Sequence, residues 1–254
     1  MQVADRVTVL RKGKSIGTVE TVNTDKQKLS EMMVGRPVEL KVKKAPARLG
    51  ETVLEARSLY VPSLVHKGRL AVKNASFSVK SGEILAIAGI DGNGQTELVY
   101  GITGLERVKS GAVVICGEDV TKTTVRHRNR NYISHIPEDR HKHAVVLDFT
   151  LMDNMVLQCY FEKEFQHMGF IKKDKVRAYA EKLIEEFDVR SAKGTETITR
   201  SMSGGNQQKA VIARELDRKK PLIIAFQPTR GLDVGAIEYI HSQLVKKRDE
   251  GHAV

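Results

Sequence analysis

Two short motifs in this chain combine residue types that bind phosphate. The first, Ser-Met-Ser-Gly-Gly-Asn-Gln-Gln-Lys over residues 201–209, stands directly before a stretch with a helical pattern, 207–218. Helix N-termini present unpaired N–H groups and a partial positive charge, and glycine lets a phosphate approach closely. The second motif, Pro-Thr-Arg-Gly-Leu-Asp over 228–233, follows the apolar run 222–226, which predicts a buried strand. The order of helix start, strand and tight turn indicates a phosphate site.

A glycine-rich loop, Gly-Ile-Asp-Gly-Asn-Gly-Gln-Thr over 89–96, is a third candidate. It follows the apolar run 84–88, which we expect to be a buried strand, and precedes a helix beginning near Thr96, as a phosphate-binding loop requires. Its backbone amides can cradle phosphates, and Thr96 stands where a Mg²⁺-binding hydroxyl belongs. Gln95, however, replaces the lysine, and a neutral hydrogen bond contributes about 0.5–1.5 kcal/mol against about 1.5–3 for a charged one. An ordinary glycine-rich turn is the alternative, which the downstream motifs disfavour.

Composition narrows the class of protein. Apolar residues make up 41% of the 254 residues, which is ordinary for a globular core, and no apolar run reaches the length of a membrane-spanning helix. We therefore expect a soluble cytoplasmic protein without a signal peptide. Cys116 and Cys159 lack metal-ligand spacing and are expected to be buried free thiols in a reducing compartment.

The net charge of +11 admits nucleic acid or a membrane surface as a partner. The lysines and arginines occur in small groups that are not interleaved with aromatic residues, which form only 5% of the chain. Platforms for stacking bases are therefore not expected. This pattern indicates that the basic residues lie on solvated faces, or that the protein is cytoplasmic and lies near anionic lipid, rather than that they form a nucleic-acid-binding groove.

The periodicity predicts the elements that position these motifs. A small unit, 1–36, should contain strands at 5–10 and 15–19 and a helix at 25–34. The polar, lysine-rich stretch 37–51 suits a linker. In the larger unit, strands are expected at 53–60, 71–79, 84–88 and 222–226, and a mostly helical region at 148–218 that includes a helix at 176–187. Strands on both sides of a helical insert predict an α/β ATPase core with a helical subdomain.

Four segments, 89–98, 136–140 (Ile-Pro-Glu-Asp-Arg), 202–209 and 227–236, occur together and carry a family resemblance. They resemble the second nucleotide-binding domain of tandem ATPase subunits from simple-sugar and nucleoside ABC importers. The Asp-Gly-Asn-Gly-Gln loop is closer to the nucleoside branch, which works with lipoprotein binding proteins. The resemblance implies an α/β P-loop NTPase fold of ABC type, with an antiparallel β-subdomain, a parallel core sheet and a helical subdomain.

The same resemblance implies the domain boundaries. Residues 1–36 resemble the tail of a first nucleotide-binding domain, 37–51 are a linker, and 52–254 resemble the second domain, with its helical subdomain at about 141–215. The chain is expected to be truncated before the switch histidine. His252 precedes the expected strand that leads to the switch histidine, and it is expected to be a surface histidine.

The resemblance also assigns roles to single positions. The Mg²⁺-binding Asp and the water-polarising Glu of the family are replaced here by Phe226 and Gln227, and Glu138 stands at the Q-loop position. Gln227 and Glu138 are thus the candidate catalytic residues, and Thr96 is a weak candidate Mg²⁺ ligand. The residues expected to contact ATP are Gly89, Ile90, Asp91, Gly92, Asn93, Gly94, Gln95, Thr96, Ser203, Gly204, Gly205, Asn206 and Asp233.

The phosphate loop lacks its lysine, whereas the signature motif at 203–205 is intact. This combination suggests that the two ATP sites of the transporter have different roles. In this family one domain's signature completes the partner domain's site, so the chain's own ATP site should hydrolyse poorly while its signature serves the partner. The expected function is to couple ATP binding and hydrolysis to uptake of a simple sugar or nucleoside. The expected location is the cytoplasmic face of the cell membrane, as a peripheral protein.

The expected partners are membrane permease subunits, the first nucleotide-binding domain and, indirectly, a substrate-binding lipoprotein, but no nucleic acid. Two other functions are open. A soluble tandem ABC ATPase acting on ribosomes or nucleic acid is favoured by the +11 charge but disfavoured by Gln95, Phe226 and Gln227. A regulatory nucleotide-binding module without catalytic duty is the third possibility.

Overall fold

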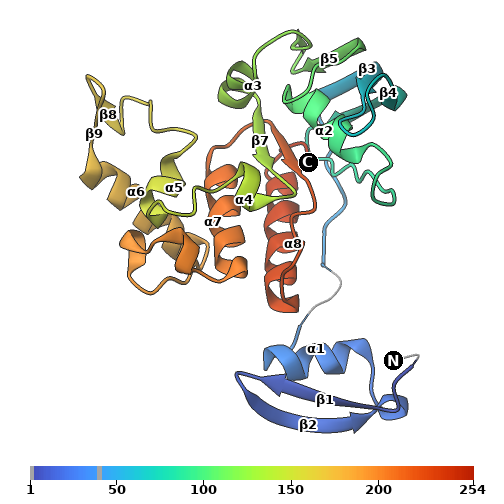
Figure 1. The fold of residues 1–254 in the computed structure, drawn as a ribbon, viewed down its shortest axis with the longest axis vertical. Coiled ribbons are helices and arrows are strands. Elements are labelled where there is room, and N and C mark those ends of the chain that lie inside the picture. The colour runs from blue at the N-terminus through green and yellow to red at the C-terminus, as the bar shows by residue number, and fades with distance from the viewer. Residues whose placement is uncertain (1–2, 39–41) are drawn as a thin grey trace.

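The N-terminal unit is a two-stranded hairpin covered by one helix. The computed structural model describes residues 3–38 and 42–254. Strands β1 (Arg6–Arg11) and β2 (Lys14–Glu20) pair antiparallel, and a short 3-10 turn, η1 (Thr21–Asn23), leads to helix α1 (Lys26–Val34). Both predicted strands and the predicted helix are confirmed. Arg36 pairs with Glu238 of helix α8 (Val234–Asp249) at 2.8 Å, and Figure 1 shows α1 facing the end of that helix.

A four-stranded antiparallel sheet of order β4-β3-β5-β6 forms the first layer of the larger unit. Its strands are β3 (Thr52–Pro62), β4 (Leu70–Lys80), β5 (Ser110–Ile115) and β6 (Glu118–Asp119). Helix α2 (Gln95–Thr103) packs on this sheet, and a Cβ at Gly101 would lie only 3.1 Å from Val61. The small residue therefore sets the close approach of the helix to β3.

A parallel strand pair forms the second layer. Strands β7 (Ile133–Ile136) and β10 (Leu222–Ala225) pair in register from Ile133–Leu222 to Ile136–Ala225. Helices α3 (Val125–Asn131), α7 (Gly204–Asp217) and α8 (Val234–Asp249) flank them (Figure 1). Because the strands are parallel, the segments that follow them, beginning at residues 137 and 226, leave the sheet at the same edge.

The expected buried strand at 84–88 is wrong. The segment has no strand structure, and Ile84, Ile87 and Ile90 are exposed. Only its start is paired, through Leu85 N to Val254 O and Val254 N to Glu83 O, both at 2.9 Å. Residues 86–88 have no ladder partner within the described part of the chain, so their backbone forms no sheet. Their apolar side chains instead line a cavity of about 500 Å³ opposite β10.

The helical region contains short elements around one core. They are α4 (Arg140–His143), α5 (Leu151–Val156), the hairpin β8 (Gln166–His167) and β9 (Phe170–Ile171), α6 (Lys173–Glu186), and the 3-10 turns η2 (Gly194–Glu196) and η3 (Thr199–Ser201). Leu151, Leu183 and Ile212 are fully buried where α5, α6 and α7 meet. The predicted helices over 176–187 and 207–218 are confirmed, although α7 begins three residues earlier.

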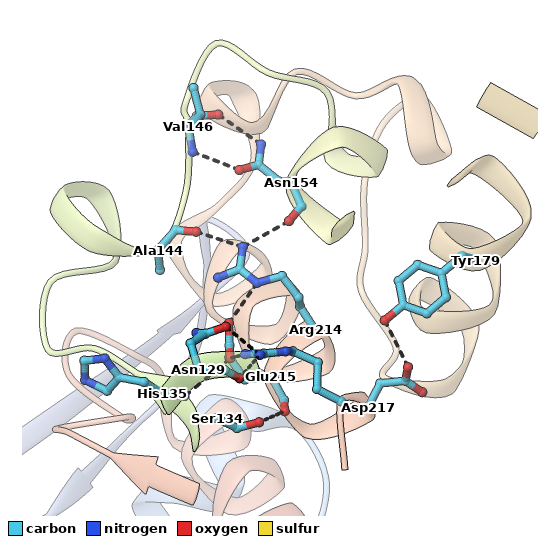
Figure 2. Close-up of polar contacts among 11 residues, drawn as sticks. Asn129, Ser134, His135, Ala144, Val146, Asn154, Tyr179, Arg214, Glu215 and Asp217 are labelled. Carbon is cyan, nitrogen blue, oxygen red and sulfur yellow. Dashed lines mark hydrogen bonds and ion pairs between the residues drawn. The ribbon is translucent and has the colours of Figure 1, made fainter. Parts of the chain in front are cut away.

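A buried network of hydrogen bonds and ion pairs connects this region to the parallel strands (Figure 2). Arg214 and Glu215, adjacent on α7 and almost inaccessible to solvent, form an ion pair at 2.9 Å. The Arg214 guanidinium also donates to the carbonyls of Ala144 (2.9 Å) and Asn154 (3.0 Å), and the Ser134 hydroxyl donates to the Glu215 carbonyl at 2.6 Å. Because each charge has several partners, the network is satisfied despite its burial.

Two single-residue expectations are corrected. Cys159 is buried as expected, but Cys116 is exposed because it occupies the β5–β6 turn with a φ of 51°, before Gly117 at 81°. His252 is half-buried rather than a free surface histidine, since 15% of its side chain is exposed and its Nδ1 lies 2.7 Å from the Lys220 carbonyl. In the described ranges we find no helix long and apolar enough to cross a membrane.

Candidate phosphate site

The start of α2 is open to a ligand. Gly94 is its N-cap with a φ of 95°, and a Cβ there would lie 2.8 Å from the Ala71 carbonyl. No side chain of the described structure caps this helix, whereas Asp25 caps α1 and Thr124 caps α3. The first N–H groups of α2 therefore point to a place where an anion can accept from them.

Gln95 is turned back into the glycine-rich loop. Its Nε2 donates to the Ile90 carbonyl at 3.1 Å, and a Cβ at Gly89 would lie 2.2 Å from the same nitrogen. Glycine at position 89 thus gives the amide its room. The side chain that stands in the lysine position braces the loop and carries no charge toward a phosphate.

One cavity brings the loop and the end of β10 together. The cavity of about 500 Å³ is lined by Asp91, Gln95 and Thr96 from the loop and the start of α2, and by Phe226 and Gln227 from the segment after β10. Gln227 is exposed and has a φ of 45°, a region that costs a non-glycine residue roughly 1–2 kcal/mol. Phenylalanine offers no metal ligand, and the glutamine amide cannot act as a base. At the end of β10 the cavity therefore has neither a metal ligand nor a base, and the titratable residues of its lining are Asp91 and His241.

The Glu138 carboxylate does not face the loop freely. It forms an ion pair with Arg230, which lies in the turn after β10. Its neighbour Asp139 caps α4, accepting from the amides of His141 (2.9 Å) and Lys142 (3.1 Å). These bonds, led by that from Lys142, lower the pKa of Asp139. The role of Arg230 was missed from the sequence, because its partner is distant along the chain.

The second candidate cluster lies at the start of α7. The Ser203 hydroxyl caps the helix by accepting from the Asn206 amide at 3.4 Å, and it also accepts from Asn206 Nδ2 at 3.0 Å. Asn206 Oδ1 in turn accepts from the Arg190 amide at 2.9 Å. A Cβ at Gly205 would meet nothing within 4 Å, so this residue faces open space.

Arg140 and His141 connect the loop after β7 to this cluster. Arg140 Nε donates to Gln207 Oε1 at 3.3 Å, and His141 Nε2 lies 2.8 Å from the same oxygen. A Cβ at Gly204 would lie 2.6 Å from Arg140 Nη2, so a side chain at this position would displace the guanidinium. At the other end of α4, His143 Nε2 lies 2.9 Å from the Tyr100 hydroxyl of α2. No sequence signal identified these three contacts.

The two clusters are separate. None of residues 203–206 lines the cavity beside Gln95, and Asp233 is engaged elsewhere, as the cap of α8 accepting from the Ala236 amide at 2.9 Å. Within the described residues we also find no group of three histidine, cysteine or carboxylate side chains that could hold a metal ion.

Comparison with known proteins identifies a family match and close relatives. The model of the family described as ABC transporter matches residues 72–230. The chain is 50% identical to the nucleoside import ATP-binding protein NupA of Lactococcus lactis and 46% identical to the guanosine import ATP-binding protein NupO of Bacillus subtilis. Each match covers 99% of this chain and 49% of the relative. The chain thus spans about half the length of these curated relatives.

Solved structures share the fold at low sequence identity. A dimeric ATP-binding cassette in a post-hydrolysis state with ADP and Pi superposes with a TM-score of 0.66 at 21% identity, covering 78% of this chain and 83% of the other. A nucleotide-free cassette superposes with a TM-score of 0.63 at 18% identity, covering 79% of each chain. These likenesses establish the α/β P-loop NTPase fold that the motifs predicted.

Proposed function

The chain belongs to the ABC transporter family, and from that premise we propose that it is the nucleotide-binding part of an ATPase that drives nucleoside import. The functions named for the relatives at 50% and 46% identity support nucleoside rather than simple-sugar cargo. In this proposal residues 52–254 form the second of two tandem nucleotide-binding domains, and 1–36 end the first. The partners are permease subunits at the cytoplasmic face of the membrane. The +11 charge is the one observation for the ribosome or nucleic-acid alternative, and the functions named for these relatives speak against it.

The observation that carries the proposal is the uncapped start of α2 beside Gln95, Thr96, Phe226 and Gln227 in one cavity. This arrangement fits the phosphates of ATP, because backbone amides supply the donors. Thr96 would contribute its hydroxyl to Mg²⁺. Bound Mg-ATP supplies the free energy that the importer uses. The chain's own residues bind and orient it, but Gln95 contributes no cation for the γ-phosphate and Phe226 and Gln227 contribute no metal ligand or base, so this site binds ATP and turns it over poorly.

The start of α7 has the complementary role. Ser203 fixes the first turn, and Gly205 leaves its solvent side open. We assign this surface to the γ-phosphate of ATP bound by the partner domain's loop. Glu138 and Asp233 are engaged with Arg230 and the Ala236 amide in this chain, so we assign them positioning roles rather than direct chemistry.

The test is Mg-ATP titration by calorimetry on the purified chain. Gln95→Lys should tighten binding roughly tenfold, because a charged hydrogen bond contributes about 1–1.5 kcal/mol more than a neutral one. Gln95→Met is the matched control of similar length without a donor, and it should not tighten binding. Steady-state ATP turnover should stay negligible in all three proteins, since Gln227 is unchanged. Equal affinity of the Lys and Met variants would contradict the placement of phosphate at α2, and robust turnover would contradict the degenerate site.

Cargo is tested separately. Cells that carry the complete importer subunit with its permease should take up labelled nucleosides and not labelled ribose, and uptake should require this subunit. Ribose uptake without nucleoside uptake would overturn the assignment.

A further inference from the structure

The hairpin β8–β9 presents apolar side chains to solvent. Met168 is 84% exposed and Phe170 is 80% exposed, and Ile171 is also exposed. Residues 167–175 are exposed without interruption. Figure 1 shows the hairpin at the outer edge of the helical region, away from the strands and from the N-terminal unit. Large apolar residues gathered at a projecting tip typically mark an interaction site.

The turn of this hairpin holds its apex residue in an unfavourable conformation. Met168 and Gly169, its two central residues, have φ values of 49° and 88°, and the Gly169 amide donates to Gln166 Oε1 at 3.0 Å. Such turns prefer Asn-Gly, because both central residues need a positive φ. Methionine there costs roughly 1–2 kcal/mol relative to its ordinary conformation. Since Met168 packs against no core, its apolar character is not explained by the stability of the fold.

Cations surround the apolar tip. Lys172, Lys173 and Lys175 directly follow Ile171, with Asp174 as the only acid among residues 167–175. Within the described ranges Lys173 and Lys175 form no ion pair, while Lys172 donates to the Lys163 carbonyl at 2.8 Å. The nearest acids before the hairpin are Glu162 and Glu164. The tip therefore combines apolar groups with solvated positive charge.

Helix α3 adds cations beside the segment that leads to the hairpin. The guanidinium groups of Arg126 and Arg130 lie 5.3 and 4.4 Å from the centre of the Phe161 ring. Phe161 thus connects the basic helix α3 to the turn segment before β8. Both elements lie at the upper side of the molecule in Figure 1.

We propose that the β8–β9 hairpin binds the surface of an anionic lipid bilayer, with Met168 and Phe170 entering the headgroup region and the lysines contacting lipid phosphates. Apolar side chains at an apex with flanking lysines are the combination that partitions into a charged membrane interface. The overall charge of +11 acts in the same direction. The proposal does not depend on nucleotide binding.

The experiment is co-sedimentation of the full 254-residue chain with vesicles of phosphatidylcholine alone or mixed with phosphatidylglycerol. Binding should require the anionic lipid and should weaken as salt rises. Met168→Ser with Phe170→Ser should lower the partition coefficient at least about tenfold. Lys173→Gln with Lys175→Gln should lower it roughly 25-fold, at about fivefold for each lysine near the surface. Val65→Ser, at a site 79% exposed and far along the chain, is the control and should bind like the wild type.

All variants should melt at the wild-type temperature, because the changed side chains are exposed. Absence of binding to anionic vesicles overturns the proposal, and so does equal binding by the Met168/Phe170 variant or by neutral vesicles. If the wild type ignores lipid but the Met168/Phe170 variant loses association with permease subunits, the hairpin is a protein contact and the lipid proposal is wrong.

Discussion

Glu138 and Arg230 form an ion pair that joins the segments leaving the two parallel strands β7 and β10. The pair lies at the sheet edge where the candidate phosphate site is built. From the same loop, Arg140 and His141 both contact Gln207 of α7, and His143 contacts Tyr100 of α2. The segment 138–143 therefore connects the helix behind the phosphate loop, the turn after β10 and the first turn of α7.

We expect Arg230→Gln to change the free energy of unfolding by less than about 1 kcal/mol, because the Arg230 side chain is 61% exposed and surface ion pairs contribute little. Urea denaturation followed by circular dichroism measures this. Arg190→Gln, at the exposed pair with Asp188, is the matched control and should behave alike. A loss above 2 kcal/mol in Arg230→Gln alone would show that the pair holds the two strand ends together.

Arg214→Met should destabilise the fold by about 3–5 kcal/mol, since it leaves the Glu215 carboxylate buried without its partner. Arg218 also contacts Glu215 at 2.9 Å and would compensate in part. Combining Arg214→Met with Glu215→Leu should cost less than the sum of the single changes, because the double variant has no buried Glu215 carboxylate lacking Arg214, although Arg218 loses its carboxylate partner in both Glu215 variants. The double-mutant cycle in urea measures the difference, and strict additivity would contradict the coupling seen in Figure 2.

The outcome at individual elements shows what the sequence could predict. Strands β3 and β4 and helix α6 follow from local periodicity, and their positions are confirmed. The run 84–88 has the same apolar character, yet it forms no strand because a strand depends on a neighbouring backbone that local composition does not encode. Cys116 shows the converse, since a turn conformation overrides the burial expected of a cysteine.

In the candidate site, too, some features could be predicted from the sequence and others could not. The glycine-rich loop and positions 226–227 could be predicted to lie together, because element order brings helix start and strand end to one edge. The contacts of Arg230 with Glu138 and of Arg140 with Gly204 could not, since each joins residues more than 60 positions apart through side-chain geometry alone.

As the pH falls, His135 should lower the stability of the protein first, at a higher pH than the carboxylates do. Burial lowers the pKa of this histidine from 6.5 to about 4, so it stays neutral in the folded chain. Nearby Glu215 raises the pKa and His143 lowers it, but burial dominates. Between pH 6.5 and 4 the unfolded state binds more protons, so stability is complete above pH 6.5 and falls by on the order of 1 kcal/mol per pH unit below it.

Denaturation midpoints at pH 7, 6 and 5 measure this effect. His135→Gln, which cannot become charged, should flatten the decline over that range. His66→Gln, at an exposed site, is the control and should keep the wild-type slope. Unchanged slopes in His135→Gln would show that another group causes the acid sensitivity. The carboxylates with lowered pKa, such as Asp139 and Asp148, lose their contribution only at lower pH.

Gly205→Glu should separate stability from transport. The Cβ of this residue would meet nothing within 4 Å, and replacing glycine in a helix gains roughly 0.5–1 kcal/mol. A carboxylate in the first turn of α7 adds about 0.3–1 kcal/mol through the helix dipole. The variant should therefore be more stable than the wild type in urea. Its charge, however, stands where we place the partner domain's γ-phosphate, and repulsion should abolish nucleoside uptake by the complete importer.

Lys26→Glu is the matched control for this prediction. It also puts an acid in the first turn of a helix, α1, at an exposed site away from α7. The dipole argument gives it a similar sign of stability change, but uptake should remain at the wild-type level because no phosphate is expected there. Gln95→Ala, in the site that already lacks its lysine, should reduce uptake far less than Gly205→Glu at matched expression. If Gln95→Ala were the more damaging change, the main hydrolytic site would be the one formed by this chain's own loop.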